Sequence, residues 1–517
     1  MHASGSGHDV PVLRAALPSV PAPPRLGDTM PAVAAQSLRL VANQTIVGFA
    51  WTAFALLLGF ATKVLLTRKM PAADLGVLLA AQAFTSLVIV VAELGLPDAV
   101  VRYVGAEASL QAAPRRTVYR AIRIVAASAL LTSGAVLVAL FLWSGSLMSA
   151  DALWATAILT LSLPLLAVGD VLGAAYRGLN QLGTKLFLID VCRPGLVAIL
   201  LLLSPLALAR HAPYVAGLYA LGALLVVAAL SVLFGRDRRW RNAGASTSME
   251  LLHFGVPVAG AAMLAGPLVN GLLPMMLSAW TGSAAVALYG IALSLQGVVG
   301  LPLGIFEQVL VPVWARMVVR GTPDELGRSY QQYAGICFAF ATGLGILLMA
   351  NDRAVLSFVF GSGYAAAAPA LQYAVLAALV AAWAGPNEAM LRAVGLSRPI
   401  FAARLITAAA GTVTAAILIP RYGLMGAVSS FVLAVVVLNV AYGTALYRAR
   451  RIHPFTWRHA VTTAAALGAV IAATALQSTY PVGGWMTAHV LAILIVAANV
   501  DLRSMLGAVR DRAVALR

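Results

Sequence analysis

The chain contains fourteen apolar stretches, each long enough to cross a membrane as a helix. A helix needs about 20 residues to span the hydrocarbon core of a bilayer. Backbone groups in lipid have no water partners, so these stretches are expected to be α-helices. The expected spans are 46–66, 76–96, 122–143, 152–172, 186–207, 212–234, 255–279, 286–310, 332–350, 366–386, 401–419, 424–446, 459–476 and 484–502.

The composition excludes several classes of protein. Of the 517 residues, 61% are hydrophobic and 10% are charged, whereas soluble domains carry about 25% charged residues. The chain therefore lacks the polar groups that a stacked soluble enzyme, a disordered protein or a secreted disulfide scaffold requires. The two cysteines, Cys192 and Cys337, lie in or beside apolar stretches and are expected to be free thiols.

The net charge of +17 is explained by the distribution of Lys and Arg among the loops between the membrane spans. With a cytoplasmic N-terminus, 29 of the 35 Lys and Arg residues fall in inner loops, the head or the tail, and six fall on the outer side. An excess of Lys and Arg in cytoplasmic loops fixes the orientation of membrane helices. The alternation predicts an even number of spans and two cytoplasmic termini. This orientation explains the charge better than nucleic-acid binding does.

Four regions are expected along the chain. Residues 1–36 form a Pro-rich, disordered cytoplasmic head with no apolar signal-peptide core, and Met30 is an alternative start. Residues 37–240 and 241–452 each form a six-helix lobe. Residues 453–517 add two further transmembrane helices and a cytoplasmic tail.

The two lobes resemble each other in sequence. The charged and glycine positions that coincide at an offset of 214 or 215 residues are Gly76 with Gly290, Glu93 with Glu307, Arg102 with Arg316, and Arg177 with Arg392. Six helices separate the copies, and an even number restores the orientation. The fold class is therefore all-α, with about 14 transmembrane helices: two parallel six-helix repeats around a central cavity, plus two C-terminal helices. Such repeats suit alternating access.

Catalytic and cofactor motifs are absent from the sequence. There is no phosphate-binding GxxxxGK[ST] loop, no HExxH, and no metal-ligand spacing among the seven His residues. We therefore expect no catalytic residue, no metal, no cofactor and no enzyme activity. A polytopic glycosyltransferase or polysaccharide polymerase remains a remote alternative, but it would need acidic residues on a sizeable outer loop.

Ionisable residues near the helix ends are the candidate functional groups, because such residues are costly in lipid and face a cavity or a partner. Glu93 and Glu307 occupy equivalent positions and are candidates for ion coupling or gating. The alternative is a structural salt bridge to Arg102 or Arg316. Asp190 and Arg193 are spaced i,i+3 and are expected to neutralise each other.

The candidate substrate-binding residues lie at the inner mouth and in the helices; they are Arg102, Arg177, Arg316, Arg392, Lys63 and Asn270. Arg presents fixed donors that suit phosphate oxygens. The alternatives are that the arginines only set topology and that Lys63 extends to the headgroups. Asn270 lies mid-membrane in the Pro- and Gly-rich span 255–279, which is either a bending element between the lobes or a statically kinked helix.

Ordered motifs give the sequence a family resemblance. LTRKMPAADLGVLL, MELLHFGVPV, ALYGIALSLQ, LVPVWARM, MLRAVGLSRP and LIPRYGLMGAVSS follow one another along the chain. Together they resemble the polysaccharide transporter (Wzx-like) flippases of the multidrug/oligosaccharidyl-lipid/polysaccharide (MOP) superfamily, over about residues 40–455. The resemblance implies a V-shaped, two-lobed transporter with a cationic cavity, in many members coupled to an ion gradient. It assigns no individual residue.

The resemblance implies a flippase that moves an isoprenoid-diphosphate-linked oligosaccharide from the cytoplasmic to the outer leaflet during polysaccharide biosynthesis. The expected location is the inner membrane of a prokaryote. The expected partners are the lipid-linked oligosaccharide, membrane lipids, and polymerase and chain-length proteins of the same pathway, with no nucleic acid. The alternatives are a peptidoglycan lipid-precursor flippase or a multidrug exporter of the same superfamily.

Overall fold

A computed structural model shows the arrangement of the helices. It describes residues 51, 54–108, 113–143, 148–179, 181–237, 240–241, 246–263, 267–320, 323–457, 460–465 and 468. The predicted head (1–36), Met30, nearly all of the last two predicted spans, and the tail lie outside these residues.

Two sets of helices follow each other in the chain. The first, which we call the N-terminal bundle, begins with a helix over residues 54–69. It continues with α2 (Ala72–Glu93), α3 (Leu96–Ala108), α4 (Arg115–Trp143), α5 (Ala150–Leu161), α6 (Leu163–Gly178), α7 (Leu182–Lys185), the π-helix η2 (Leu186–Cys192), α8 (Arg193–Leu203), α9 (Leu206–Ala209) and α10 (Ala212–Arg236). The two-residue strands β1 (Ala113–Pro114) and β2 (Trp240–Arg241) pair in parallel.

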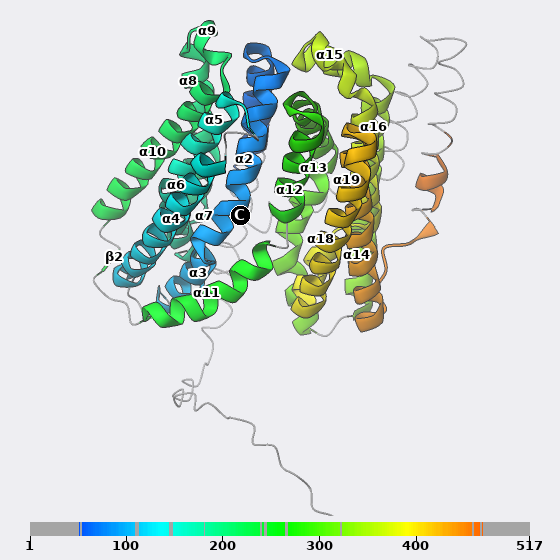
Figure 1. The fold of residues 1–517 in the computed structure, drawn as a ribbon. Coiled ribbons are helices and arrows are strands. Elements are labelled where there is room, and N and C mark those ends of the chain that lie inside the picture. Colours follow the sequence, from blue (N-terminus) through cyan, green and yellow to red (C-terminus); the bar gives the residue numbers. More distant parts are fainter. Residues whose placement is uncertain are drawn as a thin grey trace, which may run out of the picture.

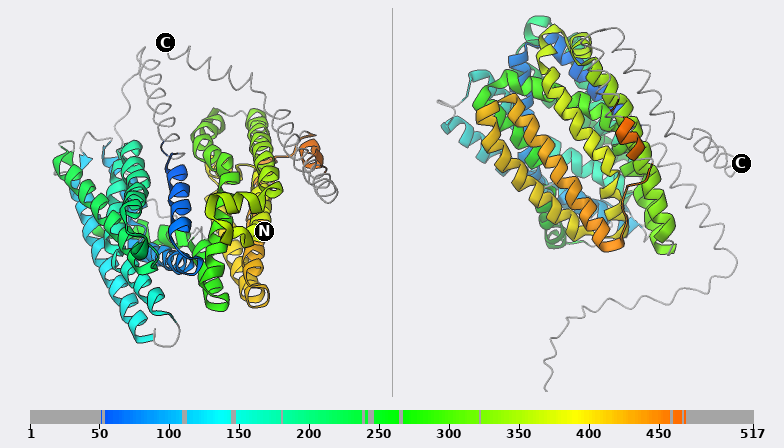
Figure 2. Two further views of the ribbon diagram at one scale, coloured as in Figure 1. Left: turned by 90° about the horizontal axis from the view of Figure 1, so that it is seen from above. Right: turned by 90° about the vertical axis from the view of Figure 1, so that its right-hand side faces the viewer.

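The second set is the C-terminal bundle. Its elements are α12 (Pro267–Thr281), α13 (Ser283–Arg320), α14 (Pro323–Ala350), α15 (Asp352–Phe360), the 3₁₀-helix η3 (Ser362–Ala367), α16 (Ala368–Ala384), α17 (Asn387–Val394), α18 (Ser397–Tyr422) and α19 (Leu424–Arg450). Helix α11 (Ser248–Met263) precedes this bundle and packs against α3. Figure 2 shows the two sets beside each other, in blue to green and in green to orange.

Ten helical stretches of the described chain are long and apolar enough to cross a membrane. They correspond to ten of the predicted spans, from 76–96 to 424–446, with the span 255–279 left out. The protein is therefore an all-α, multi-pass membrane protein. Since nearly all of the last two predicted spans lies outside the described residues, the total of fourteen stays a prediction.

The predicted span 255–279 is two helices rather than one. It corresponds to α11 and α12, which run in different directions (Figure 1). Helix α11 begins before the apolar run, because a reciprocal cap starts it. The backbone N–H and hydroxyl of Thr247 donate to the Glu250 carboxylate, and the Glu250 N–H donates back to the Thr247 hydroxyl. These bonds lower the pKa of Glu250.

Buried apolar side chains form three cores, and their positions relate the two bundles. One core contains residues of both bundles, including Leu78 of α2 and Tyr289 of α13. The second lies mainly in the N-terminal bundle and α11, and the third in the C-terminal bundle. The shared core lies toward the α9 and α15 end, and the separate cores lie toward the α3 and α11 end (Figure 1). In the described chain the bundles are thus joined at one end and packed independently at the other.

Candidate functional site

The junction between the bundles depends on small residues of α2 and α13. A Cβ atom placed on Gly76 would lie 1.6 Å from the backbone oxygen of Ser283. A Cβ on Gly290 would lie 2.7 Å from the side chain of Leu79. Gly76 and Gly290 are equivalent in the sequence repeat, so each bundle contributes a close approach to the other. These contacts lie in the region of the shared core.

Lys63 lies at the same junction. Its ammonium group donates a hydrogen bond of 2.8 Å to the hydroxyl of Ser294 on α13. The Ser294 hydroxyl in turn donates to the backbone oxygen of Gly290. The cation therefore contacts the other bundle. A cation in this position can bind an anionic group that enters between the bundles.

At the opposite end, the chain turns sharply between α2 and α3. Leu94 and Gly95 both adopt the left-handed conformation, with φ of 51° and 66°. A Cβ on Gly95 would lie 2.1 Å from the backbone oxygen of Gly255, so this corner packs closely on α11. The turn carries Arg102 to α11, where its guanidinium lies 4.5 Å from the ring centroid of Phe254.

The carboxyl group of Glu93 lies close to that of Asp170 on α6. Asp98 lies nearby and forms an ion pair of 3.1 Å with Arg177. The pair of Glu93 with Arg102, which the sequence left as an alternative, is not present: Glu93 contacts an acid, and Arg102 stacks on Phe254.

A cavity of about 530 Å³ in the N-terminal bundle has several polar and ionisable groups in its lining. It is lined from α2, α6, α8 and α10 by polar groups that include Thr85, Asp170, Arg193 and Tyr219. Cavities with ionisable walls inside a membrane protein mark polar pathways or sites.

Asp190, on the π-helix, also lines this cavity. It pairs with Lys185 at 2.6 Å, so the predicted pair of Asp190 with Arg193 is wrong. In a π-helix the backbone bonds join residues five apart. Lys185 and Asp190 have this spacing, whereas the sequence reading assumed α-helical phase.

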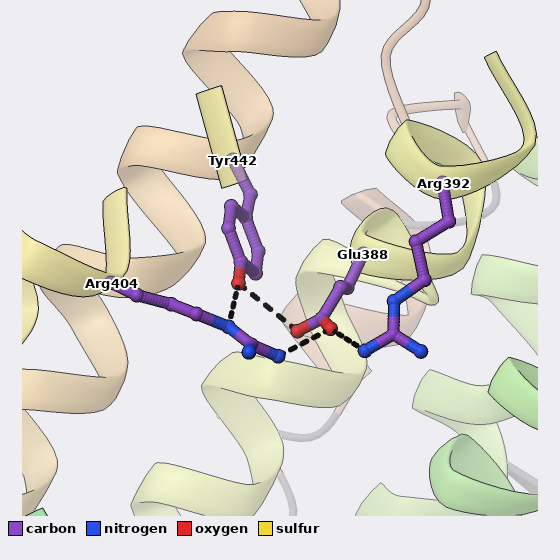
Figure 3. Close-up of polar contacts among 4 residues, drawn as sticks. All are labelled: Glu388, Arg392, Arg404 and Tyr442. Carbon is purple, nitrogen blue, oxygen red and sulfur yellow. Dashed lines mark hydrogen bonds and ion pairs between the residues drawn. The ribbon is translucent and has the colours of Figure 1, made fainter. Parts of the chain in front are cut away.

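Glu388 is the centre of a polar network in the C-terminal bundle (Figure 3). Its carboxylate accepts hydrogen bonds from Arg404 at 2.6 Å and from the Tyr442 hydroxyl at 3.0 Å, and it pairs with Arg392 one helical turn away. Arg404 also donates to the Tyr442 oxygen at 3.1 Å. Glu307 lies within electrostatic range of Glu388 and Arg392. One carboxylate thus holds α17, α18 and α19 together.

This network lies beside a break between α16 and α17. Gly385 has a φ of 74° and ends α16. The hydroxyl of Tyr330 donates to the backbone oxygen of Ala384, and the amide of Asn387 donates to that of Asn439. The bonds at the break are made by side chains from α14 and α19. The network and the break form a polar support at the end of the C-terminal bundle opposite α15.

The structure divides the predicted substrate residues. Arg177 and Arg392 have carboxylate partners, Arg102 stacks on an aromatic ring, and Lys63 bridges the bundles. The backbones of Asn270 and Arg316 lie in α12 and α13, and their side chains are outside the described ones. Sequence reasoning did not select Asp170 as a partner of Glu93, nor Glu388, Arg404 and Tyr442.

One further group of residues meets far from these clusters. Ligand atoms of Asp74, Asp151 and His211 lie within 4.8 Å of one another, near the first turns of α2, α5 and α10. Their wide separation in sequence explains why ligand spacing did not reveal them.

The chain folds as an all-α, multi-pass membrane protein with ionisable groups in its spanning helices, and this fold is similar to that of transporters of the MOP superfamily. A lipid II flippase, MurJ, in an inward closed conformation has a TM-score of 0.64 at 12% identity, over 88% of this chain and 98% of that chain. An inward-facing multidrug resistance MATE transporter of the MOP superfamily has a TM-score of 0.56 at 14% identity, over 79% and 98%. No curated protein matches the chain in sequence.

A family model described as "Polysaccharide biosynthesis protein" matches residues 41–318. The chain belongs to this family, which confirms the resemblance seen in its motifs.

Proposed function

We propose that the protein is a flippase, not an enzyme. It moves an isoprenoid-diphosphate-linked oligosaccharide from the cytoplasmic to the outer leaflet of a prokaryotic inner membrane, with both termini in the cytoplasm. The observation that carries the proposal is the family match over residues 41–318 on a MOP transporter fold. The expected partners are membrane lipids and the polymerase and chain-length proteins of the same pathway.

The arrangement of the cores supports alternating access. The bundles share one core at the end with α9 and α15 and have separate cores at the other end. The Lys- and Arg-rich loops at the end with separate cores favour a cytoplasmic location for that end. A diphosphate and its sugars cannot cross hydrocarbon unaided, because burying unpaired polar groups is costly. A path that opens between the bundles while the isoprenoid tail stays in lipid avoids that cost.

Cations near this path suit the diphosphate. Arg102, Arg177, Arg316 and Arg392 occupy repeat-related positions at the inner end, where they can attract the substrate. Lys63 provides a cation further along, at the junction. Asn270 is proposed to contact the sugar–diphosphate region from α12.

Flipping in proteoliposomes tests the proposal. The purified protein is reconstituted with a fluorescent isoprenoid-diphosphate oligosaccharide, and a membrane-impermeant reagent reports the exposed fraction. Faster transfer than in protein-free vesicles and in vesicles with a heat-inactivated sample is expected. Transfer at the protein-free rate with a properly folded sample would exclude this substrate class.

Glu93 and Glu307 are proposed to couple flipping to a proton gradient. Glu93 lies beside a second acid, Asp170, and Glu307 lies beside Glu388 and Arg392. The variants Glu93→Gln and Glu307→Gln should each change the pH dependence of the flipping rate. An unchanged pH profile in both variants would make the two residues structural.

A second candidate substrate is a peptidoglycan lipid precursor. The observation in its favour is the 0.64 TM-score with the lipid II flippase over 88% of this chain. A multidrug exporter is a third, because MATE transporters share the fold. Competition in the same vesicles distinguishes the three candidate substrates. Only an unlabelled compound of the transported class should slow the transfer of the labelled oligosaccharide lipid. Loss of a surface glycan without loss of viability or of drug resistance in a deletion strain would favour the oligosaccharide.

A further inference from the structure

A large apolar groove lies on the C-terminal bundle, next to the break between α16 and α17, and its lining includes Tyr330, Ala384 and Asn439. It has a volume of about 740 Å³ and is lined by α14, α16, α19 and residues 451–455. In Figure 1, α16 and α19 lie next to each other on the side of the molecule farthest from the N-terminal bundle. No residue of the N-terminal bundle belongs to its described lining. Its volume falls within the range of small-molecule sites, about 300–1,000 Å³.

The chain that follows α19 builds one wall of the groove. Arg451 adopts the left-handed conformation, with a φ of 56°, and ends the helix. The next residues fold back onto the bundle, where Ile452 is buried. The ring of Phe455 then packs on Trp383 of α16 with centroids 4.6 Å apart, and His453 stacks on Phe455. This aromatic wall faces α19 across the groove.

The groove is also open at one point along α19. A Cβ placed on Gly443 would meet no heavy atom within 4 Å. Val436 and Val440 lie on the same helix along the groove, and Trp383 and Phe455 face them. The walls can therefore receive an extended hydrocarbon chain.

Cations lie in the lining at the end where α19 finishes. Arg448 and Arg451 are both exposed, and the guanidinium of Arg451 is held 5.1 Å from the ring centroid of Tyr447. No acid among the described residues forms an ion pair with either arginine, and the described lining contains no Asp or Glu. These guanidinium groups are therefore available to phosphate oxygens.

We propose that this groove binds an anionic phospholipid of the inner leaflet, with an acyl chain along α19 and the phosphate at Arg448 and Arg451. Charge complementarity selects this occupant: the walls are apolar, the rim is cationic, and the rim lies on the Lys- and Arg-rich side of the chain, where anionic lipids are recognised by basic residues. The site is separate from the proposed transport path.

Lipid retention by the full-length protein tests the proposal. The delipidated protein is titrated with palmitoyl-oleoyl-phosphatidylglycerol or with the matching phosphatidylcholine, and bound lipid is counted by native mass spectrometry. The wild type should retain phosphatidylglycerol at least five times better than phosphatidylcholine.

Two variants separate the rim from the walls. The double variant Arg448→Gln/Arg451→Gln should lower the preference for phosphatidylglycerol over phosphatidylcholine to about one. Gly443→Leu, which places a side chain in the open part of the groove, should reduce retention of both lipids. The matched controls are Arg236→Gln, an exposed arginine on α10, and Gly134→Leu, a position on α4 that is also open.

Three results would overturn the proposal. Unchanged retention in both groove variants would place the lipid elsewhere. Equal losses in the controls would mean that the lipid binds the whole surface. Displacement of phosphatidylglycerol by an isoprenoid diphosphate would assign the groove to the substrate tail instead.

Discussion

Lys63 and Ser294 come from different bundles and are joined by a hydrogen bond of 2.8 Å. Lys63 belongs to the first described helix and Ser294 to α13, and Gly290 accepts the next bond in the chain. A cation that is held in place by a hydroxyl can exchange that partner for a phosphate oxygen at little cost. This contact is therefore both a link between the bundles and a candidate station for the substrate.

Removing the Lys63 cation should impair transport more than removing its partner. Lys63→Met is expected to lower the flipping rate at least tenfold, because the diphosphate loses its counter-charge at the junction. Ser294→Ala should retain more than half of the rate. The control is Arg210→Gln, which removes an exposed cation elsewhere on the molecule. Equal rates for Lys63→Met and Arg210→Gln would show that Lys63 only anchors the helix.

Arg102 and Arg316 are expected to affect flipping because of where they lie in the chain, and not only because they are positively charged. Replacing Arg102 and Arg316 together by Ala is expected to lower flipping at low substrate concentration, because fewer substrates are drawn to the inner mouth. Replacing Arg14 and Arg25 of the head removes the same charge elsewhere. Flipping rates at matched expression compare the two, and identical rates would exclude a cationic vestibule.

Glu388 should support the fold of the C-terminal bundle. Glu388→Gln removes the charge that Arg404 and Arg392 contact, and should lower stability by about 1.5–3 kcal/mol, the usual contribution of a hydrogen bond to a charged group. Tyr442→Phe removes a hydroxyl and should cost about 0.5–1.5 kcal/mol. Thermal unfolding of the purified protein measures both. Glu325→Gln, on an exposed part of α14, should leave the midpoint unchanged.

The absence of a side chain at Gly76 is expected to allow the close contact between α2 and α13. In Gly76→Ala the new Cβ would overlap the backbone oxygen of Ser283, so α2 and α13 must separate. Spin labels at positions 210 and 353, in a protein with Cys192 and Cys337 replaced by Ala, should report a longer distance. Gly217→Ala, where a Cβ meets nothing within 4 Å, is the control. An unchanged distance in Gly76→Ala would show that the helices adjust locally.

The membrane spans were predictable because each one is a continuous apolar run. The span at 255–279 was not, since Pro257 lies inside α11 and a second proline, Pro267, begins α12. Hydrophobicity alone does not locate a helix end within such a run. The cap formed by Thr247 and Glu250 is the local signal that marks where α11 begins.

The partners of the charged residues were less predictable, because they depend on folding over long distances. Glu388 meets Tyr442 across 54 residues of sequence, a separation at which spacing carries no information. The left-handed turn at Leu94 and Gly95 ends the helix after Glu93, and Arg102 lies on the next helix, α3, against Phe254. Candidate residues could be selected by their cost in lipid, whereas their pairing required the fold.

The π-helix Leu186–Cys192 holds about one extra residue compared with an α-helix of the same number of turns, because its backbone bonds join residues five apart. Without that extra residue, the side chains on one side of it would be rotated by about 100°, the angle per residue of an α-helix. The π-helix therefore sets the direction in which Asp190 meets its cavity and Lys185, five residues away.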